Sequence, residues 1–81
     1  MKARVYVTFK TTVLDPQGQT IRAALNGLGH SSITGVRQGK FFEIDIAGSD
    51  RQAAAQELDA ISRDLLSNPV IEDYQLVFLD S

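Results

Sequence analysis

Apolar and polar side chains alternate with a period of two along short stretches of this chain, and that pattern constrains the fold more than any other feature. In "RVYVTFK", Val5, Val7 and Phe9 point to one side and the residues between them to the other. In "VIEDYQLVFLD", Tyr74, Leu76 and Phe78 share one face. This spacing, with β-branched and aromatic residues, predicts a strand at each end of the chain.

Two amphipathic segments lie between these strands. In "VLDPQGQTI", Asp15 is suited to cap a helix and Pro16 to occupy its first position. An apolar stripe of Ile21, Leu25 and Leu28 follows, and nearby glycines end the helix. A second helix is expected after "SDRQ", a capping-box spacing with Ser49 as the cap. Its apolar face is formed by Ala54, Leu58, Ile61 and Leu65.

The stretch "ITGVRQGKFFEIDIAG" between the helices is interpreted as two strands joined by a turn at Gln38-Gly39-Lys40. The predicted order is then β-α-β-β-α-β. This order predicts a ferredoxin-like α+β domain over residues 1–81, with an antiparallel sheet and both helices on one face. A chain of 81 residues has a thin core of its own, which favours association with a partner.

Four apolar side chains are expected on the helix-free face of this sheet. They are Tyr6, Phe41, Val77 and Leu79. A contiguous apolar patch on a small domain marks an interaction surface, and the alternative is that polar neighbours such as Arg4 and Glu43 separate these side chains. We expect the four residues to be buried between subunits.

The composition excludes several kinds of chemistry. The chain has no cysteine and one histidine, so it supplies neither a thiol nucleophile nor a multi-histidine metal site. His30 is interpreted as a loop residue, and Glu43 with Asp45 as a solvated pair rather than an acid/base pair. A formal charge of −2 argues against nucleic acid, and no apolar stretch reaches the ~20 residues that span a bilayer. A cytoplasmic protein is expected.

A small-molecule sensor stays open as an alternative. ACT-like regulatory domains share the predicted element order and bind amino acids near a turn after the first strand. The stretch "LDPQG" is similar to that turn.

Four motifs in order, "VYVTFK", "VLDPQG", "VRQGKFFEI" and "NPVIEDY", resemble the small S subunit of formylglycinamide ribonucleotide amidotransferase, the PurS family. The resemblance covers almost the whole chain. It implies a non-catalytic subunit of an ATP- and glutamine-dependent ligase of de novo purine synthesis. No cofactor is expected on this chain, and ATP, Mg and glutamine are used by the complex.

The resemblance also implies the partners. A large synthetase subunit binds ATP and the ribonucleotide, a glutaminase subunit releases ammonia, and the small subunit is a homodimer that joins them. A role in ammonia transfer is consistent with the family. Arg37 and Lys40, beside the predicted turn, are candidates to pair with an acidic partner surface, and Gly18 is a candidate for close approach by a neighbouring subunit.

Overall fold

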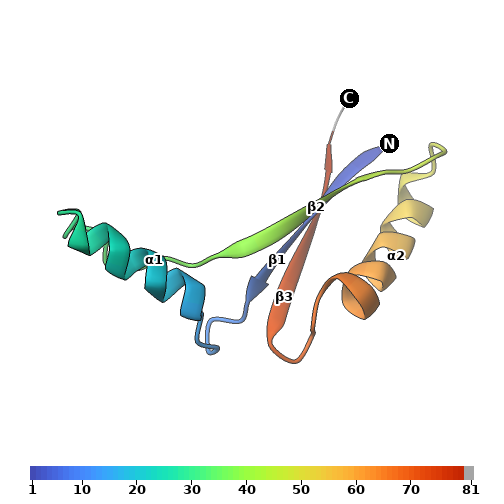
Figure 1. Cartoon of the computed structure of the whole chain (residues 1–81). Helices are drawn as coiled ribbons and strands as arrows, with labels where there is room; N and C mark the ends of the chain where they lie inside the picture. The colour runs from blue at the N-terminus through green and yellow to red at the C-terminus, as the bar shows by residue number, and fades with distance from the viewer. Residues whose placement is uncertain (80–81) are drawn as a thin grey trace.

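The computed structural model describes residues 1–79, and Figure 1 shows the arrangement of the elements. In chain order they are β1 (Lys2–Phe9), α1 (Pro16–Gly27), β2 (Gly39–Asp45), α2 (Arg51–Ile61), the π-helical turn η1 (Ser62–Leu66) and β3 (Glu72–Leu79). Within these residues no helix is long and apolar enough to cross a bilayer.

The three strands form one antiparallel sheet in the order β2-β1-β3. The central strand places Val5 between Phe42 of β2 and Leu76 of β3. Because side chains alternate along each strand, these three residues share one face with Ala3 and Val7. The predicted division of β1 into two faces is therefore confirmed.

Helix α2 covers that face on the β3 side of the sheet (Figure 1). The buried core consists of Ala3, Val5 and Val7 from β1 with Ala54 and Leu58 from α2. At the edge of this contact the Tyr74 hydroxyl donates a hydrogen bond of 2.7 Å to the Asp59 carboxylate. The amphipathic stripe of α2 thus packs as its spacing predicts.

The ends of α2 differ from the sequence prediction in two details. Its cap is Asp50, whose side chain accepts from the backbone N–H of Ala53, and not Ser49. After Ile61 the helix widens into η1, closed by a hydrogen bond from Ser67 N–H to the Ser62 carbonyl. This wider turn rotates Leu65 away from the core, so it is exposed rather than part of the buried stripe.

Helix α1 begins where the sequence predicts, with Asp15 as its cap and Pro16 in its first turn. It does not pack on the sheet. Figure 1 shows α1 beyond the end of the sheet, on the opposite side from α2. The stripe of Ile21 and Leu28 is consequently exposed, and Leu25 is only half-buried.

The α+β class, with an antiparallel sheet and two helices, is confirmed. The predicted hairpin is wrong. Residues 33–38 form no strand, and the chain runs straight through Gln38 and Gly39 into β2 instead of turning back at Lys40. The order β2-β1-β3 is that of a ferredoxin-like sheet in which one edge strand is absent and the helix beside it has moved out.

Candidate interaction sites

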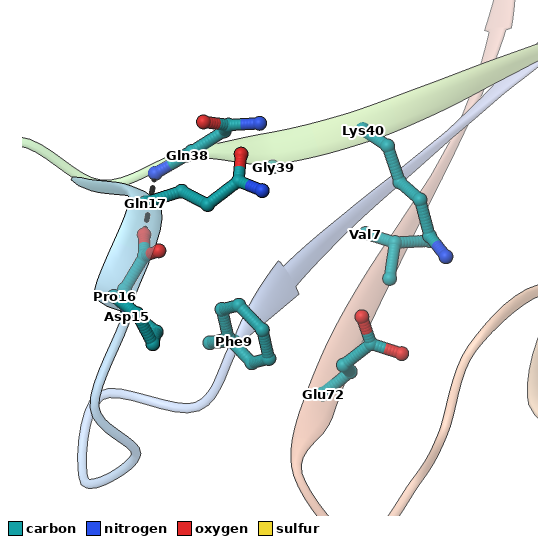
Figure 2. Close-up of a pocket in the computed structure, with 9 residues that line it drawn as sticks. All are labelled: Val7, Phe9, Asp15, Pro16, Gln17, Gln38, Gly39, Lys40 and Glu72. Carbon is teal, nitrogen blue, oxygen red and sulfur yellow. Dashed lines mark hydrogen bonds between the residues drawn. The ribbon is translucent and has the colours of Figure 1, made fainter. Parts of the chain in front are cut away.

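The loop between β1 and α1 is organised around the carboxylate of Asp15, which is only 2% exposed. One oxygen, Oδ1, accepts a hydrogen bond of 3.0 Å from Gly18 N–H in the first turn of α1. The other, Oδ2, accepts one of 2.6 Å from Gln38 N–H just before β2, drawn as the dashed line in Figure 2. Asp15 therefore ties the start of α1 to the start of β2.

These hydrogen bonds set the charge of Asp15. The bond from Gln38 N–H, then that from Gly18 N–H, holds the pKa of the carboxyl below its usual range, and the nearby Arg37 charge acts in the same direction. Both carboxylate oxygens already have backbone donors. Within the "LDPQG" turn, the Asp15 carboxylate is therefore bound by backbone groups of its own chain.

Arg37, next to Gln38, also bonds to the loop between β1 and α1. Its guanidinium donates to the carbonyl oxygens of Lys10 at 2.9 Å and of Phe9 and Val13 at 3.3 Å each. A planar guanidinium suits this task because its donors are held in a fixed fork. The side chain that we predicted to reach toward an acidic partner is directed at the backbone of its own chain.

Gly18 is a point of close approach, as the sequence suggested, but the neighbour belongs to the same chain. A Cβ atom at this position would clash with the carbonyl oxygen of Val36 and would lie 2.7 Å from the Asp15 carboxylate. Only glycine lets α1 approach this segment so closely. We call Asp15, Gly18 and Arg37, with the backbone they hold, the junction clamp.

An open pocket of about 480 Å³ lies beside the clamp (Figure 2). Its lining residues are Val7, Phe9, Asp15, Pro16, Gln17, Gln38, Gly39, Lys40 and Glu72. The ionisable side chains are one ammonium and two carboxylates, and Asp15 is already bound on both oxygens. Lys40 also lies near the Phe42 ring, 5.7 Å from its centroid. The pocket presents no nucleophile with an adjacent base.

On the helix-free face, Tyr6 and Phe41 lie side by side across β1 and β2. Their ring centroids are 5.8 Å apart with the planes tilted by 38°, and Phe41 is 56% exposed. The Arg4 guanidinium lies over the Phe41 ring at 5.4 Å. Tyr6, Phe41 and Arg4 form an exposed group that we call the aromatic pair with its arginine.

Val77 and Leu79 share this face but lie on β3, across β1 from Phe41. Their cross-strand neighbours on β1 are Arg4 and Lys2. Both of these cations pair with Glu43, Lys2 at 3.2 Å and Arg4 at 3.3 Å. Charged side chains therefore lie among the four residues predicted as one patch, between Phe41 on β2 and the pair Val77 and Leu79 on β3.

Both carboxylates of β2, those of Glu43 and Asp45, pair with cations of β1. A hydrogen bond from Lys2, followed by its charge, lowers the pKa of Glu43, and Arg4 acts in the same direction. Asp45 lies 3.9 Å from the Lys2 ammonium. No group of three or more side chains able to hold a metal ion occurs in residues 1–79. The carboxylates of Glu43 and Asp45 are thus paired with cations on the surface of the sheet.

Sequence reasoning missed two features that the structure brings forward. One is the hydrogen bond from Gln38 N–H to the Asp15 carboxylate, which joins residues 23 positions apart and leaves no local signal in the sequence. The other is the exposure of the α1 stripe, in which Leu28 is 77% exposed. His30, which we interpreted as a loop residue, lies exposed in the turn after α1.

Comparisons with known proteins agree with one another. The family model PurS, described as phosphoribosylformylglycinamidine (FGAM) synthase, matches residues 2–80. A phosphoribosylformylglycinamidine synthase subunit PurS of Mycobacterium leprae is 47% identical, over 93% of this chain and 91% of its own. A structure of Bacillus subtilis PurS is 39% identical with a TM-score of 0.82, covering 94% of each chain.

A structure of PurLQS from Thermotoga maritima contains a similar chain. It matches with a TM-score of 0.87 at 27% identity, over 96% of this chain and 95% of its own. We find no support for the ACT-like alternative among these comparisons.

Proposed function

Because the chain belongs to the PurS family of phosphoribosylformylglycinamidine synthase subunits, we propose that it is the assembly subunit of that enzyme, without an active site of its own. In this role it joins the ATP-dependent synthetase subunit to the glutaminase subunit in de novo purine synthesis. The observation that carries the proposal is the similarity to PurLQS of Thermotoga maritima across 96% of the chain.

The chemistry of the side chains supports a role in assembly. The reactive thiol of a glutaminase has no counterpart here, because the sequence contains no cysteine. The carboxylates best placed to act together, Glu43 and Asp45, face the Lys2 ammonium, and Asp15 holds backbone N–H groups. We therefore assign ATP, magnesium and glutamine to the other subunits of the complex.

The proposed assembly contains a homodimer of this chain and acts in the cytoplasm. We propose that Tyr6, Phe41, Val77 and Leu79 are buried against other subunits. The exposure of Phe41 and its contact with Arg4 support this, since aromatic and arginine side chains are enriched in interfaces. Lys40, exposed at the start of β2, is a further candidate contact. Holding synthetase and glutaminase in one assembly would assist ammonia transfer between them.

Reconstitution tests this function. Synthetase and glutaminase are assayed for glutamine-dependent amidation of formylglycinamide ribonucleotide, with and without this chain. We expect activity only when all three are present. Ammonium chloride in place of glutamine is the control, because free ammonia removes the need to join the two subunits. Equal glutamine-dependent rates with and without the chain would contradict the proposed function.

A further inference from the structure

The connection between α2 and β3 contains two features that cost stability. The helix leaves α-helical geometry at η1, and π-helical turns of this kind are rare in proteins but frequent at functional sites. Ser62, at the start of the turn, is fully buried, and its hydroxyl has no hydrogen-bond partner within residues 1–79. A buried polar group without a partner is unfavourable, so its presence here requires an explanation.

The wider turn decides which leucine reaches the core. Leu66 is half-buried, whereas Leu65 is 78% exposed, although the apolar spacing of α2 places Leu65 on the buried stripe. Val70, in the turn before β3, is also 78% exposed. These are the two most exposed large apolar side chains within residues 1–79, and both belong to one connection. We call Leu65 and Val70 the exposed aliphatic residues.

Hydrogen bonds hold the connection in one conformation. The Ser67 hydroxyl donates to the Ser62 carbonyl oxygen at 2.7 Å. Asn68 accepts from Val70 N–H at 3.1 Å through its side chain, and from Glu72 N–H at 2.7 Å through its carbonyl oxygen. The N–H of Asn68 donates to the Glu72 carboxylate at 2.7 Å. A surface that is ordered in advance loses less conformational entropy on binding, so this connection is suited to present side chains to a partner.

The surroundings of the connection are acidic. Residues 57–73 contain five carboxylates and one cation, whereas the rest of the chain carries a formal net charge of +2. The cation, Arg63, is shared by one carboxylate of α2 at 3.8 Å and one of η1 at 3.1 Å. Lys10 pairs with Asp73 at 2.8 Å where β3 begins, at the end of the sheet away from the N-terminus (Figure 1). Carboxylates therefore remain in excess around the exposed aliphatic residues.

We propose that Leu65 and Val70 are contact residues for the synthetase subunit, on a surface where an apolar socket is bordered by lysine and arginine side chains. The aliphatic side chains enter the socket, and the carboxylates around them face its basic border. In this role the π-helical turn and the buried Ser62 hydroxyl lower the stability of the chain in return for the exposure of Leu65.

The charge of the connection favours the synthetase over the other occupants. A subunit that binds ATP and a ribonucleotide needs basic side chains to hold phosphate groups, whereas the glutamine substrate of the glutaminase has no net charge. A second copy of this chain is disfavoured, because two identical acidic connections would repel each other at a symmetric contact. The inference rests on the proposed function and adds the surface that the synthetase recognises.

Photo-cross-linking in the reconstituted complex tests the contact directly, because a chain without cysteine accepts a thiol label at chosen positions only. Leu65→Cys and Val70→Cys proteins carrying a benzophenone maleimide are assembled with synthetase and glutaminase and irradiated. We expect both positions to link to synthetase peptides that contain lysine or arginine. Gln52→Cys is the control, because Gln52 is exposed in the first turn of α2, at the other end of the helix, and should give no such link.

The outcomes separate this inference from the proposed function. Links from residues 65 and 70 to the glutaminase or to a second copy overturn the inference and leave the function intact. The absence of any link, in a mixture whose glutamine-dependent activity requires the chain, overturns it as well. Equal activity with and without the chain would instead contradict the proposed function.

Substitution at Leu65 provides an independent test. The readout is the concentration of this chain that gives half-maximal glutamine-dependent activity with synthetase and glutaminase. We expect Leu65→Ser to raise this concentration at least about tenfold, because truncating a central apolar contact costs that much in affinity. Leu65→Met keeps an apolar side chain of similar volume and should match the wild type.

Two further measurements complete this test. Leu65 is exposed, so thermal unfolding of Leu65→Ser should match the wild type, and its homodimer should be unchanged in sedimentation. A weakened homodimer would assign the residue to a contact between copies and overturn the inference. The same concentration requirement for Leu65→Ser and Leu65→Met would overturn it too.

Discussion

The carboxylate of Asp15 accepts a 2.6 Å hydrogen bond from the backbone N–H of Gln38, and this contact fixes where helix α1 lies relative to strand β2. The same side chain caps α1 through Gly18 N–H. One residue thus begins the helix and sets the direction of the strand that follows it. Changes at Asp15 are expected to alter the arrangement of the elements as well as the stability of the helix.

The stability of the clamp should depend on pH through Asp15. Folding lowers the pKa of this carboxyl, mainly through the Gln38 and Gly18 hydrogen bonds, so its stabilising effect is fully present above the pKa of the unfolded chain. The effect is lost as the pH falls through the lower pKa of the folded protein. Thermal unfolding from pH 7 to pH 2.5 should therefore show a steeper acid loss for the wild type than for Asp15→Asn.

Asp50→Asn is the matched control for the change of a capping residue, because Asp50 caps α2 with a bond to Ala53 N–H and does not reach a second element. At pH 7 and constant protein concentration it should change the unfolding temperature little, because asparagine caps helices about as well as aspartate. If stability fell equally steeply with acid in Asp15→Asn and in the wild type, protonation of Asp15 would not be coupled to unfolding.

Gly18→Ala should destabilise the protein even though alanine is the better helix former. The new Cβ would meet the carbonyl oxygen of Val36 and the Asp15 carboxylate, and overpacking of this kind costs about 1–3 kcal/mol. Gly27→Ala, in the same helix, is the control, since its Cβ would meet no atom within 4 Å. That change should raise stability by about 0.5–1 kcal/mol. Denaturant unfolding of both variants measures the difference, and a stabilised Gly18→Ala would contradict the close approach.

Local patterns were enough to predict most elements of this chain. The alternation in β1 and the stripe of Ala54 and Leu58 correctly gave their buried faces, because each depends on spacing within one segment. The cap of α2 was misplaced by one residue, since Ser49 and Asp50 are both good capping residues. Leu65 was misplaced because the apolar spacing of α2 gives no sign that the helix widens into a π-helical turn after Ile61.

The prediction of a hairpin was wrong for a different reason. The sequence has two strand-like segments that meet at Gln38-Gly39. This local pattern is the same whether the chain folds back into a hairpin or continues straight. The straight path depends on the bonds from Gln38 N–H to Asp15 and from Arg37 to Lys10, whose partners are more than 20 residues away. The helix-free face shows the same limit, because no pattern in the sequence indicates that Lys2 and Arg4 pair with Glu43 among the residues of the predicted patch.

Replacing Arg37 should distinguish its role in the clamp from a role in charge pairing with a partner. A lysine keeps the charge but lacks the planar fork that reaches the carbonyl oxygens of Phe9, Lys10 and Val13. We expect Arg37→Lys to lose stability on the order of 1 kcal/mol, nearly as much as Arg37→Ala. Lys40→Ala is the control and should change stability little. Full retention of stability by Arg37→Lys would favour a simple charge contact.

Phe41→Glu should weaken the association of this chain with other copies. Phe41 is 56% exposed beside Tyr6 and Arg4, so a carboxylate there would be accommodated by the isolated chain but would be costly at a buried contact. An interface anchor is worth about 2 kcal/mol or more, which predicts a weakening of the dimer by at least about tenfold in sedimentation equilibrium. Val70→Glu adds the same charge at another exposed apolar position and should leave the dimer unchanged. If Phe41→Glu also left it unchanged, the aromatic pair would lie outside the dimer contact. The same variant would then be tested for weaker binding to the synthetase and glutaminase subunits in the reconstituted complex.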